Sequence, residues 1–196
     1  MKILAGELKG RRLTTPRGTT TRPTADQVRI ALMDTLMPRL PGARVLDLFA
    51  GAGGVGLEAL SRGAIHATFV ERDRRAVAAL RDNIAALGLK ERARVLAEDV
   101  ARALDRLVRE GASFDVVFLD PPYESSLGDA ILDHVGAGGL AAADGVVIAQ
   151  HFTKRAPVIA GPLTPFRTRR FGETTLTFFR SADYDAGSRA DPSERI

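Results

Sequence analysis

The sequence contains no cysteine and only three histidines among its 196 residues. Without cysteine the chain can form neither disulfide bonds nor thiolate metal sites, and this composition fits a reducing cytosol. No apolar run approaches the length of a membrane span, and the N-terminal residues do not resemble a signal peptide. We therefore expect a cytoplasmic protein that has no membrane partner. We also expect no bound metal, because the three histidines lie far apart and lack the spacing of metal ligands: His66, His134 and His151.

The length and the hydrophobic content of 45% are sufficient for one domain with a proper core. We expect a basic hairpin and helix over residues 1–40, a main domain over residues 41–182, and a disordered tail over residues 183–196. The tail is polar, with glycine, proline and mixed charge, and this composition does not support a packed core. Nothing in the sequence indicates an oligomer, so a monomer is the default expectation.

Basic residues are concentrated toward the two ends of the chain. Residues 1–39 contain eight basic and three acidic residues, and residues 151–180 contain six basic residues and one acidic residue. Because the whole chain carries a net charge of +4, the middle and the tail together are acidic. Basic ends around an acidic middle are typical of a surface that follows the phosphates of a nucleic acid. The candidates for RNA contact, unless they merely solvate a surface, are Lys9, Arg11, Arg12 and Arg22.

Strands and helices alternate from about residue 43, which predicts a parallel sheet with helices on both faces. The clearest helix places Val77, Leu80 and Ile84 at helical spacing and stops at Gly88. Two last strands joined at Gly172 predict a terminal antiparallel hairpin. The expected strands are residues 44–49, 66–70, 93–97, 114–119, 145–150, 164–170 and 174–180.

Two features precede the expected sheet. Residues 2–15 alternate around Gly6 and Gly10, which predicts a small basic β-hairpin. Thr24 and Gln27 have the spacing of a capping box, which predicts that a helix with one apolar face begins there.

A glycine-rich turn follows the first expected strand of the sheet. Gly51, Gly53 and Gly56 form the pattern G-x-G-x-x-G, which lets the backbone approach a ligand and places helix N-terminal amides beside it. The pattern alone does not distinguish a dinucleotide from other nucleotide-like ligands. Asp47, inside the end of the strand, would repel a diphosphate and would suit a cation. S-adenosylmethionine (AdoMet) carries an ammonium and a sulfonium group and has no phosphate.

Acidic residues also follow the next two expected strands. Glu71, with Arg72 beside it, ends the second strand, where an acid can hold a ribose diol. The alternative is a solvated acid at the start of a helix. Asp99 follows the third strand, where its carboxylate could accept from an adenine amino group while the backbone N–H of Val100 donates to the ring. The alternative for Asp99 is a helix N-cap.

The most informative motif is Asp120-Pro121-Pro122-Tyr123, which follows the apolar run at residues 114–119. A carboxylate at the end of a parallel strand lies where open α/β sheets bind their ligands. The two prolines stiffen the loop and remove two backbone donors. With the ring of Tyr123, these groups suit a planar base that carries an exocyclic amino group. The alternative is a proline-stiffened turn without a ligand.

Combined, these motifs resemble a known family. Asp-x-Phe-x-Gly-x-Gly from residue 47 and Asp-Pro-Pro-Tyr from residue 120 resemble the class I AdoMet-dependent methyltransferases that act on exocyclic amino nitrogens. The segments at residues 22–29 (Arg-Pro-Thr-Ala-Asp-Gln-Val-Arg) and 56–64 narrow the resemblance. From about residue 3 to residue 180 the chain resembles the RsmD family, the bacterial 16S ribosomal RNA guanine-N2 methyltransferases.

The resemblance implies a seven-stranded Rossmann-like α/β sheet with helices on both faces and a terminal antiparallel hairpin. It implies AdoMet as the cofactor and 16S rRNA as the partner, within the small ribosomal subunit or its assembly intermediates. The implied catalytic residues are Asp120, Pro121, Pro122 and Tyr123. The implied AdoMet contacts are Asp47, Phe49, Gly51, Gly53, Gly56, Glu71, Arg72, Asp99, Val100 and Thr24.

Three other functions stay open from the residues alone. An adenine-N6 methyltransferase of DNA or RNA would share the Asp-Pro-Pro-Tyr motif, although 196 residues leave little room for a separate DNA-recognition domain. An NAD-dependent oxidoreductase would share the glycine pattern, and Asp47 argues against it. A non-catalytic RNA-binding assembly factor would not need an intact motif at Asp120.

Overall fold

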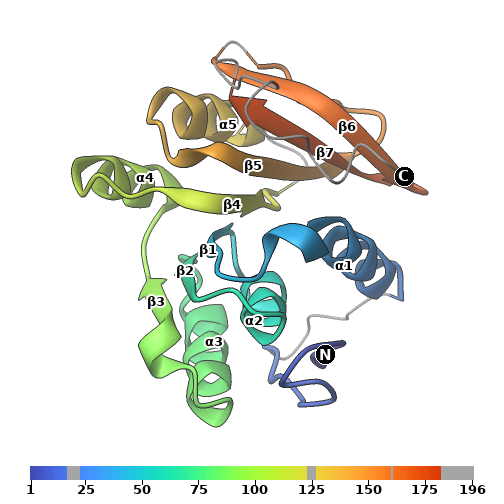
Figure 1. The fold of residues 1–196 in the computed structure, drawn as a ribbon, viewed down its shortest axis with the longest axis vertical. Helices are drawn as coiled ribbons and strands as arrows, with labels where there is room; N and C mark the ends of the chain where they lie inside the picture. The colour runs from blue at the N-terminus through green and yellow to red at the C-terminus, as the bar shows by residue number, and fades with distance from the viewer. Residues whose placement is uncertain (17–22, 123–126, 160, 182–196) are drawn as a thin grey trace.

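The computed structural model describes residues 1–16, 23–122, 127–159 and 161–181. One seven-stranded sheet runs through the molecule in the order β3-β2-β1-β4-β5-β7-β6 (Figure 1). The first five strands in this order are parallel, and β7 is antiparallel to both of its neighbours. The strands are β1 (Arg44–Leu48), β2 (His66–Val70), β3 (Ala93–Leu96), β4 (Phe114–Leu119), β5 (Ala141–Phe152), β6 (Leu163–Phe171) and β7 (Thr174–Ser181).

Helices cover both faces of the sheet and create two hydrophobic cores. Adjacent residues of one strand face opposite cores, as Val45 and Leu46 do in β1. The first core packs α1, α2 and α3 on the sheet, and the second packs α4 and α5 on the other face. Because both faces are covered there, the inner parallel strands β1, β2 and β4 are mostly apolar and buried, whereas the edge strand β6 is largely exposed. The helices are α1 (Pro23–Leu36), α2 (Gly54–Ser61), α3 (Arg74–Ala86), α4 (Val100–Arg109) and α5 (Leu127–Ala137), with short 3₁₀ turns η1 (Met37–Arg39) and η2 (Lys90–Arg92).

The predicted fold class is confirmed, and the strand bounds agree to within one residue at each end except in β5. β5 begins at Ala141 and ends at Phe152, beyond the predicted range of 145–150. Its last residues pair antiparallel with the start of β7, where Phe152 lies opposite Thr174. This pairing extends β5 past its parallel neighbour β4. The predicted turn at Gly172 joins β6 to β7 with φ of +61°.

The N-terminal segment folds back on itself, as predicted for a hairpin over residues 2–15. It has one antiparallel bridge, between Lys2 and Arg12, and backbone hydrogen bonds on both sides of that bridge. The segment also bonds to α2, because the amides of Leu4 and Ala5 donate to the two carboxylate oxygens of Glu58 at 2.8 and 2.9 Å. Glu58 is fully buried, so the hairpin is anchored on α2, which the sequence did not predict.

The start of α1 also differs from the prediction. The helix begins at Pro23, so Thr24 lies inside the first turn and is not the N-cap. Proline is favoured at the first helical position because its missing N–H would have no partner there. The apolar face of α1 packs in the same core as the sheet, through Val28, Leu32 and Leu36. The predicted tail over 183–196 lies outside the described residues. No helix in the described ranges combines the length and apolar character that crossing a bilayer requires.

Candidate functional site

Four acidic residues lie along one edge of the sheet. Because β3, β2, β1 and β4 are parallel, the loops that follow them meet at the same edge. Across the sheet the acids therefore follow the order Asp99, Glu71, Asp47 and Asp120. Two cavities open at this edge, with volumes of about 380 Å³ and about 350 Å³, and Phe49 and Asp120 line both. The sequence motifs are thus brought together in one elongated site.

The loop after β1 has an uncommon backbone conformation. Phe49 adopts a φ of +61°, which is sterically unfavourable for a bulky residue and is found mostly at functional sites. Gly51 has a φ of +57°, and a Cβ atom added there would meet nothing within 4 Å. The backbone of Gly51 therefore borders open space in the larger cavity. This is the geometry expected where a ligand approaches the main chain.

The other two glycines of the pattern shape the turn. Gly53 has a φ of +86°, and a Cβ there would lie 2.5 Å from the side chain of Leu80. A Cβ on Gly56 would lie 2.3 Å from the ring of Phe69. The lining of the two cavities includes Gly51 but neither Gly53 nor Gly56. Gly53 and Gly56 allow α2 to pack closely on the sheet and so place its N-terminus at the site.

Asp47 is a buried carboxylate at the floor of the larger cavity. Only 2% of the residue is exposed, and its Oδ2 atom accepts from the backbone N–H of Gly56 at 2.9 Å. The pKa of Asp47 is raised from 3.8 to about 7, chiefly by burial and further by the nearby charges of Asp120 and Glu71, against the lowering effect of the Gly56 bond. A cation bound beside Asp47 would relieve this unfavourable environment.

Glu71 is engaged by three backbone amides. Its Oε2 atom accepts from Gly51 N–H at 2.9 Å, and its Oε1 atom accepts from the N–H groups of Arg72 and Asp73, both at 2.8 Å. The carboxylate therefore fastens the glycine-rich loop to the end of β2. Both Glu71 and Arg72 line the smaller cavity. A carboxylate has about four acceptor positions, so Glu71 can also accept a hydroxyl from a ligand.

Asp99 is the N-cap of α4, which was the alternative interpretation of its role. Its Oδ1 atom accepts from Ala101 N–H at 3.0 Å, and its Oδ2 atom lies 3.5 Å from Nη1 of Arg72. Asp99 and Val100 both line the smaller cavity. The cap thus fixes the carboxylate at the cavity wall, beside the first residue of α4.

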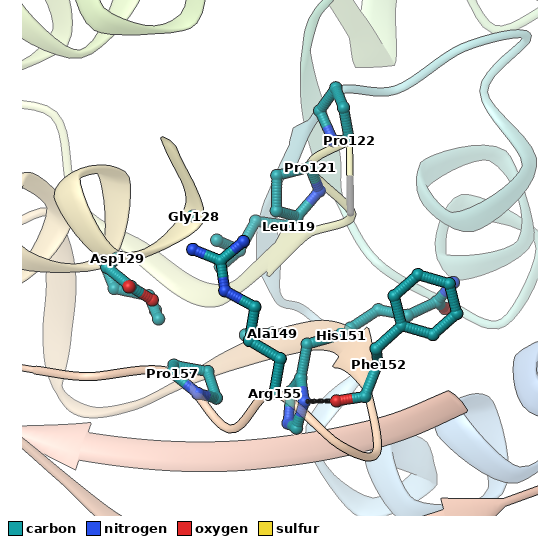
Figure 2. Close-up of a pocket in the computed structure, with 12 residues that line it drawn as sticks. Leu119, Pro121, Pro122, Gly128, Asp129, Ala149, His151, Phe152, Arg155 and Pro157 are labelled. Carbon is teal, nitrogen blue, oxygen red and sulfur yellow. Dashed lines mark hydrogen bonds between the residues drawn. The ribbon is translucent and has the colours of Figure 1, made fainter. Parts of the chain in front are cut away.

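The loop after β4 separates two spaces. Asp120, Pro121 and Pro122 line the smaller cavity, and both prolines also line a separate pocket of about 30 Å³. Figure 2 shows this pocket, with Pro121 and Pro122 above Arg155 and Phe152 in the view. Because two successive prolines restrict the backbone, they stiffen the loop that begins with Asp120.

Three predicted site residues lie wholly or partly outside the structure's described part. Tyr123 and Arg22 fall outside the described residues. Thr24 lies in α1, but its side chain is not described. The structure therefore does not place these three side chains relative to the cavities.

The candidate RNA-binding residues Lys9, Arg11 and Arg12 do not line either cavity. Nη2 of Arg11 donates to the carbonyl of Ala86 at 2.7 Å, where it interacts favourably with the C-terminal end of α3. Because α3 starts at the site edge of the sheet and runs away from it, its C-terminus lies roughly 20 Å from that edge. The guanidinium of Arg11 therefore lies away from the edge of the sheet where Asp120 lies.

Among the residues that line the larger cavity, sequence reasoning did not single out the cation Arg29 or the amide Gln150. Arg29 belongs to the Arg-Pro-Thr segment and directly follows Val28, which is part of the apolar face of α1. The helical pattern places Arg29 beside that face and does not indicate that it contacts a ligand. Gln150 lies near the end of β5, and only the sheet topology brings it beside Asp120.

The arrangement fits AdoMet rather than a dinucleotide. The larger cavity combines two carboxylates, Asp47 and Asp120, with one buried guanidinium from Arg29. This charge pattern matches a zwitterionic amino acid that carries a further positive charge, and it opposes a diphosphate. The smaller cavity offers acids at positions that suit a nucleoside, Glu71 and Asp99.

The sheet order and the antiparallel β7 define the class I methyltransferase fold. A similar solved structure is titled "Putative methyltransferase yhhF from Escherichia coli": it is 31% identical, its TM-score is 0.81, and the match covers 92% of this chain and 97% of that one. A protein of Bacillus subtilis (strain 168) named "Putative rRNA methyltransferase YlbH" is 36% identical over 92% of this chain and 98% of its own length.

The family model described as "Conserved hypothetical protein 95" matches residues 1–180, so the chain belongs to that family. "Ribosomal RNA small subunit methyltransferase D" of Escherichia coli (strain K12) is 40% identical over 127 residues. That match covers 65% of this chain and 62% of the relative's length. The resemblance to the RsmD family is thereby confirmed.

Proposed function

We propose that the protein transfers the methyl group of AdoMet to the exocyclic N2 atom of a guanine in small-subunit (16S) ribosomal RNA. The observation that carries the proposal is the position of Asp120, which lines both cavities and is followed by two prolines. Membership of the family and the names of the relatives in Bacillus subtilis and Escherichia coli support the RNA substrate.

Each of the two cavities suits a different part of AdoMet. Asp47 at the floor of the larger cavity suits the ammonium group, and Asp120, which lines both cavities, suits a base beside the sulfonium. Glu71 in the smaller cavity suits the ribose hydroxyls, with the Gly51 loop held beside it. Asp99 and the N–H of Val100 suit the edge of an adenine ring.

Guanine N2 is a weak nucleophile because its lone pair is delocalised into the ring. Asp120 and the carbonyl of Pro121 can each accept one N–H bond from the amino group, which favours its pyramidalisation and directs the lone pair. AdoMet, when bound, supplies an electrophilic methyl group on a sulfonium. Positioning of this kind can contribute on the order of 7–11 kcal/mol. A dedicated general base is not needed, because a methylated aminium loses its proton readily.

Tyr123 completes the proposed base site. Its ring would stack on the guanine, and stacking of a base on an aromatic side chain contributes roughly 1–3 kcal/mol. A target guanine in a stacked RNA element must be turned out of the stack to reach Asp120. We infer that the substrate is the small subunit or an assembly intermediate in the cytoplasm, and that the protein acts as a monomer.

Methyl transfer to ribosomal particles tests the proposal. Small-subunit particles that lack the modification are incubated with the protein and with AdoMet carrying a labelled methyl group, and the RNA is digested to nucleosides. We expect the label in N2-methylguanosine of 16S RNA. Label in N6-methyladenosine would replace the proposal with the adenine alternative. Absence of label, with protein that binds AdoMet, would favour a non-catalytic assembly factor.

A further inference from the structure

The two halves of the sheet edge that carries Asp120 differ in charge. The four acids of the site follow β3, β2, β1 and β4. β5 ends at the same edge beside β4, and the turn between β6 and β7 lies there too, because Phe152, the last residue of β5, pairs with Thr174, the first residue of β7. The exposed charged residues of this second half are the cations Lys154, Arg155 and Arg170 and one acid in the turn, Glu173.

Two of these cations have no acid to neutralise them. Neither Lys154 nor Arg170 forms an ion pair with another described residue, whereas Arg94, for example, is paired with Glu110. Basic residues on an edge strand can serve to prevent pairing with another chain. This explains Arg170 in β6 but not Lys154, which lies in the loop after β5. A shared anionic partner explains both.

Thr153 ties the loop after β5 to the turn between β6 and β7. Its backbone N–H donates to the carbonyl of Glu173 at 2.8 Å, and its hydroxyl donates to the carbonyl of Gly172 at 3.0 Å. The same hydroxyl oxygen lies 2.8 Å from that of Thr175. The loop and the turn therefore form one surface, and the cations of both are held on a common backbone frame.

An exposed aromatic ring lies beside the loop that begins with Asp120. Phe152 is 39% exposed, and it lines the small pocket together with Pro121 and Pro122 (Figure 2). When the target guanine is turned out of its stack, the nucleotide next to it has a base face that is no longer covered. A phenylalanine ring can stack on such a face, and neighbouring cations can bind the phosphates of the same strand.

We propose that the loop after β5 and the turn between β6 and β7 bind the RNA strand next to the target guanine. Phe152 stacks on the neighbouring base, and Lys154 and Arg170 neutralise phosphates of that strand. The proposal rests on the proposed function, because it extends the same substrate from Asp120 along the sheet edge. The RNA strand then follows the basic half of the edge and avoids the acids, which repel phosphates.

The salt dependence of binding to unmethylated small-subunit particles tests the two cations. The double variant Lys154→Gln with Arg170→Gln should reduce the log–log slope of affinity against salt by about 0.7–0.9 for each phosphate that it no longer neutralises. Its AdoMet affinity in calorimetry should equal that of the wild type. The matched control is Lys90→Gln with Arg109→Gln. Both control residues are exposed and lie at the opposite edge of the sheet, before β3 and at the end of α4, so this variant should keep the wild-type slope.

Variants of Phe152 test the stacking separately. Phe152→Leu keeps an apolar side chain and should weaken particle binding roughly 5- to 150-fold, as for the loss of one base–aromatic stack, without changing the salt slope. Phe152→Tyr keeps the ring and should keep the wild-type affinity. Because leucine and tyrosine both preserve apolar packing, a difference between the two variants reports the ring itself.

A double variant with the wild-type slope would overturn the proposal and leave Lys154 and Arg170 on a solvated edge. Equal affinities of Phe152→Leu and Phe152→Tyr would also overturn it. In both cases the wild type still methylates the particles, and the proposed function stands. A wild type that binds AdoMet but neither binds nor methylates the particles would refute the proposed function and this surface together.

Discussion

Replacing Asp47 with asparagine should change how the stability of the ligand-free protein depends on pH. The pKa of Asp47 is about 7 in the folded protein and 3.8 for the unperturbed carboxyl, so the folded state retains a proton that the unfolded chain releases. Its stabilising contribution is therefore complete below about pH 3.8 and is lost as the pH rises through about 7. Asparagine cannot ionise, and its side-chain oxygen can still accept from Gly56 N–H.

The size of the effect follows from these two values. Between pH 5 and pH 8 the linkage relation gives a loss of about 3 kcal/mol in the wild type that the variant does not share. The assay is urea unfolding of both proteins at several pH values without ligand. Contributions from the other ionisable groups cancel in the difference between the two proteins. If the free energy of unfolding changed with pH by the same amount in the wild type and the variant, the conclusion that Asp47 is buried and binds a proton in the folded state would be refuted.

Ligand binding gives a second measurement of the protonation of Asp47. A cation beside Asp47 favours its ionised form, so AdoMet binding near pH 7 should release a proton from the wild type and none from Asp47→Asn. Calorimetry in buffers of different ionisation enthalpy measures this release. Adenosine, which has neither the ammonium nor the sulfonium, is the control ligand and should release much less.

Three further predictions concern other parts of the site. Glu71→Ala should weaken AdoMet binding by roughly 1.5–3 kcal/mol in calorimetry, because a charged acceptor and the anchor of the Gly51 loop are both lost. Unchanged affinity would mean that Glu71 is only a surface acid. Tyr123→Phe should retain most activity, whereas Tyr123→Ala should lose roughly ten- to a hundred-fold in rate, and equal damage from both in folded, AdoMet-binding protein would contradict a stacking role. Replacing Lys9, Arg11 and Arg12 with alanine should reduce the salt dependence of RNA binding by about 0.7–0.9 in log–log slope for each phosphate that the variant no longer neutralises. The pair Lys154 and Arg155, which lies just after β5, is the comparison for that variant. An unchanged slope for the triple variant would assign Lys9, Arg11 and Arg12 to a solvated surface.

The sheet could be predicted from sequence because strand patterns depend on local residues. The run Phe114–Leu119 is apolar except for Asp115 because both faces of the sheet are covered there, and this marks a parallel strand without any knowledge of its neighbours. The acids at the strand ends could be predicted for the same reason. Since parallel strands end at one edge, residues as distant as Asp47 and Asp120 were expected together, and both line the larger cavity.

The parts that could not be predicted depend on long-range contacts. The N-terminal segment folds back on itself, as its alternation predicts, but Glu58 also provides buried acceptors for its amides, and nothing local to residues 2–15 indicates this. Arg29 gave no signal of its own, because only the packing of α1 against the start of α2 brings it to the larger cavity. Asp99 had two local interpretations, and the structure shows the N-cap together with a place at the cavity wall.

The most direct test of the proposed mechanism is whether Asp120 acts on the base rather than on the cofactor. Methyl transfer to small-subunit particles and AdoMet affinity are measured side by side for the wild type and for Asp120→Ala. We predict that Asp120→Ala abolishes formation of N2-methylguanosine and leaves AdoMet affinity within a few-fold of the wild type, because the proposed mechanism assigns this carboxylate to the guanine amino group. Loss of AdoMet binding together with residual methyl transfer would contradict the mechanism.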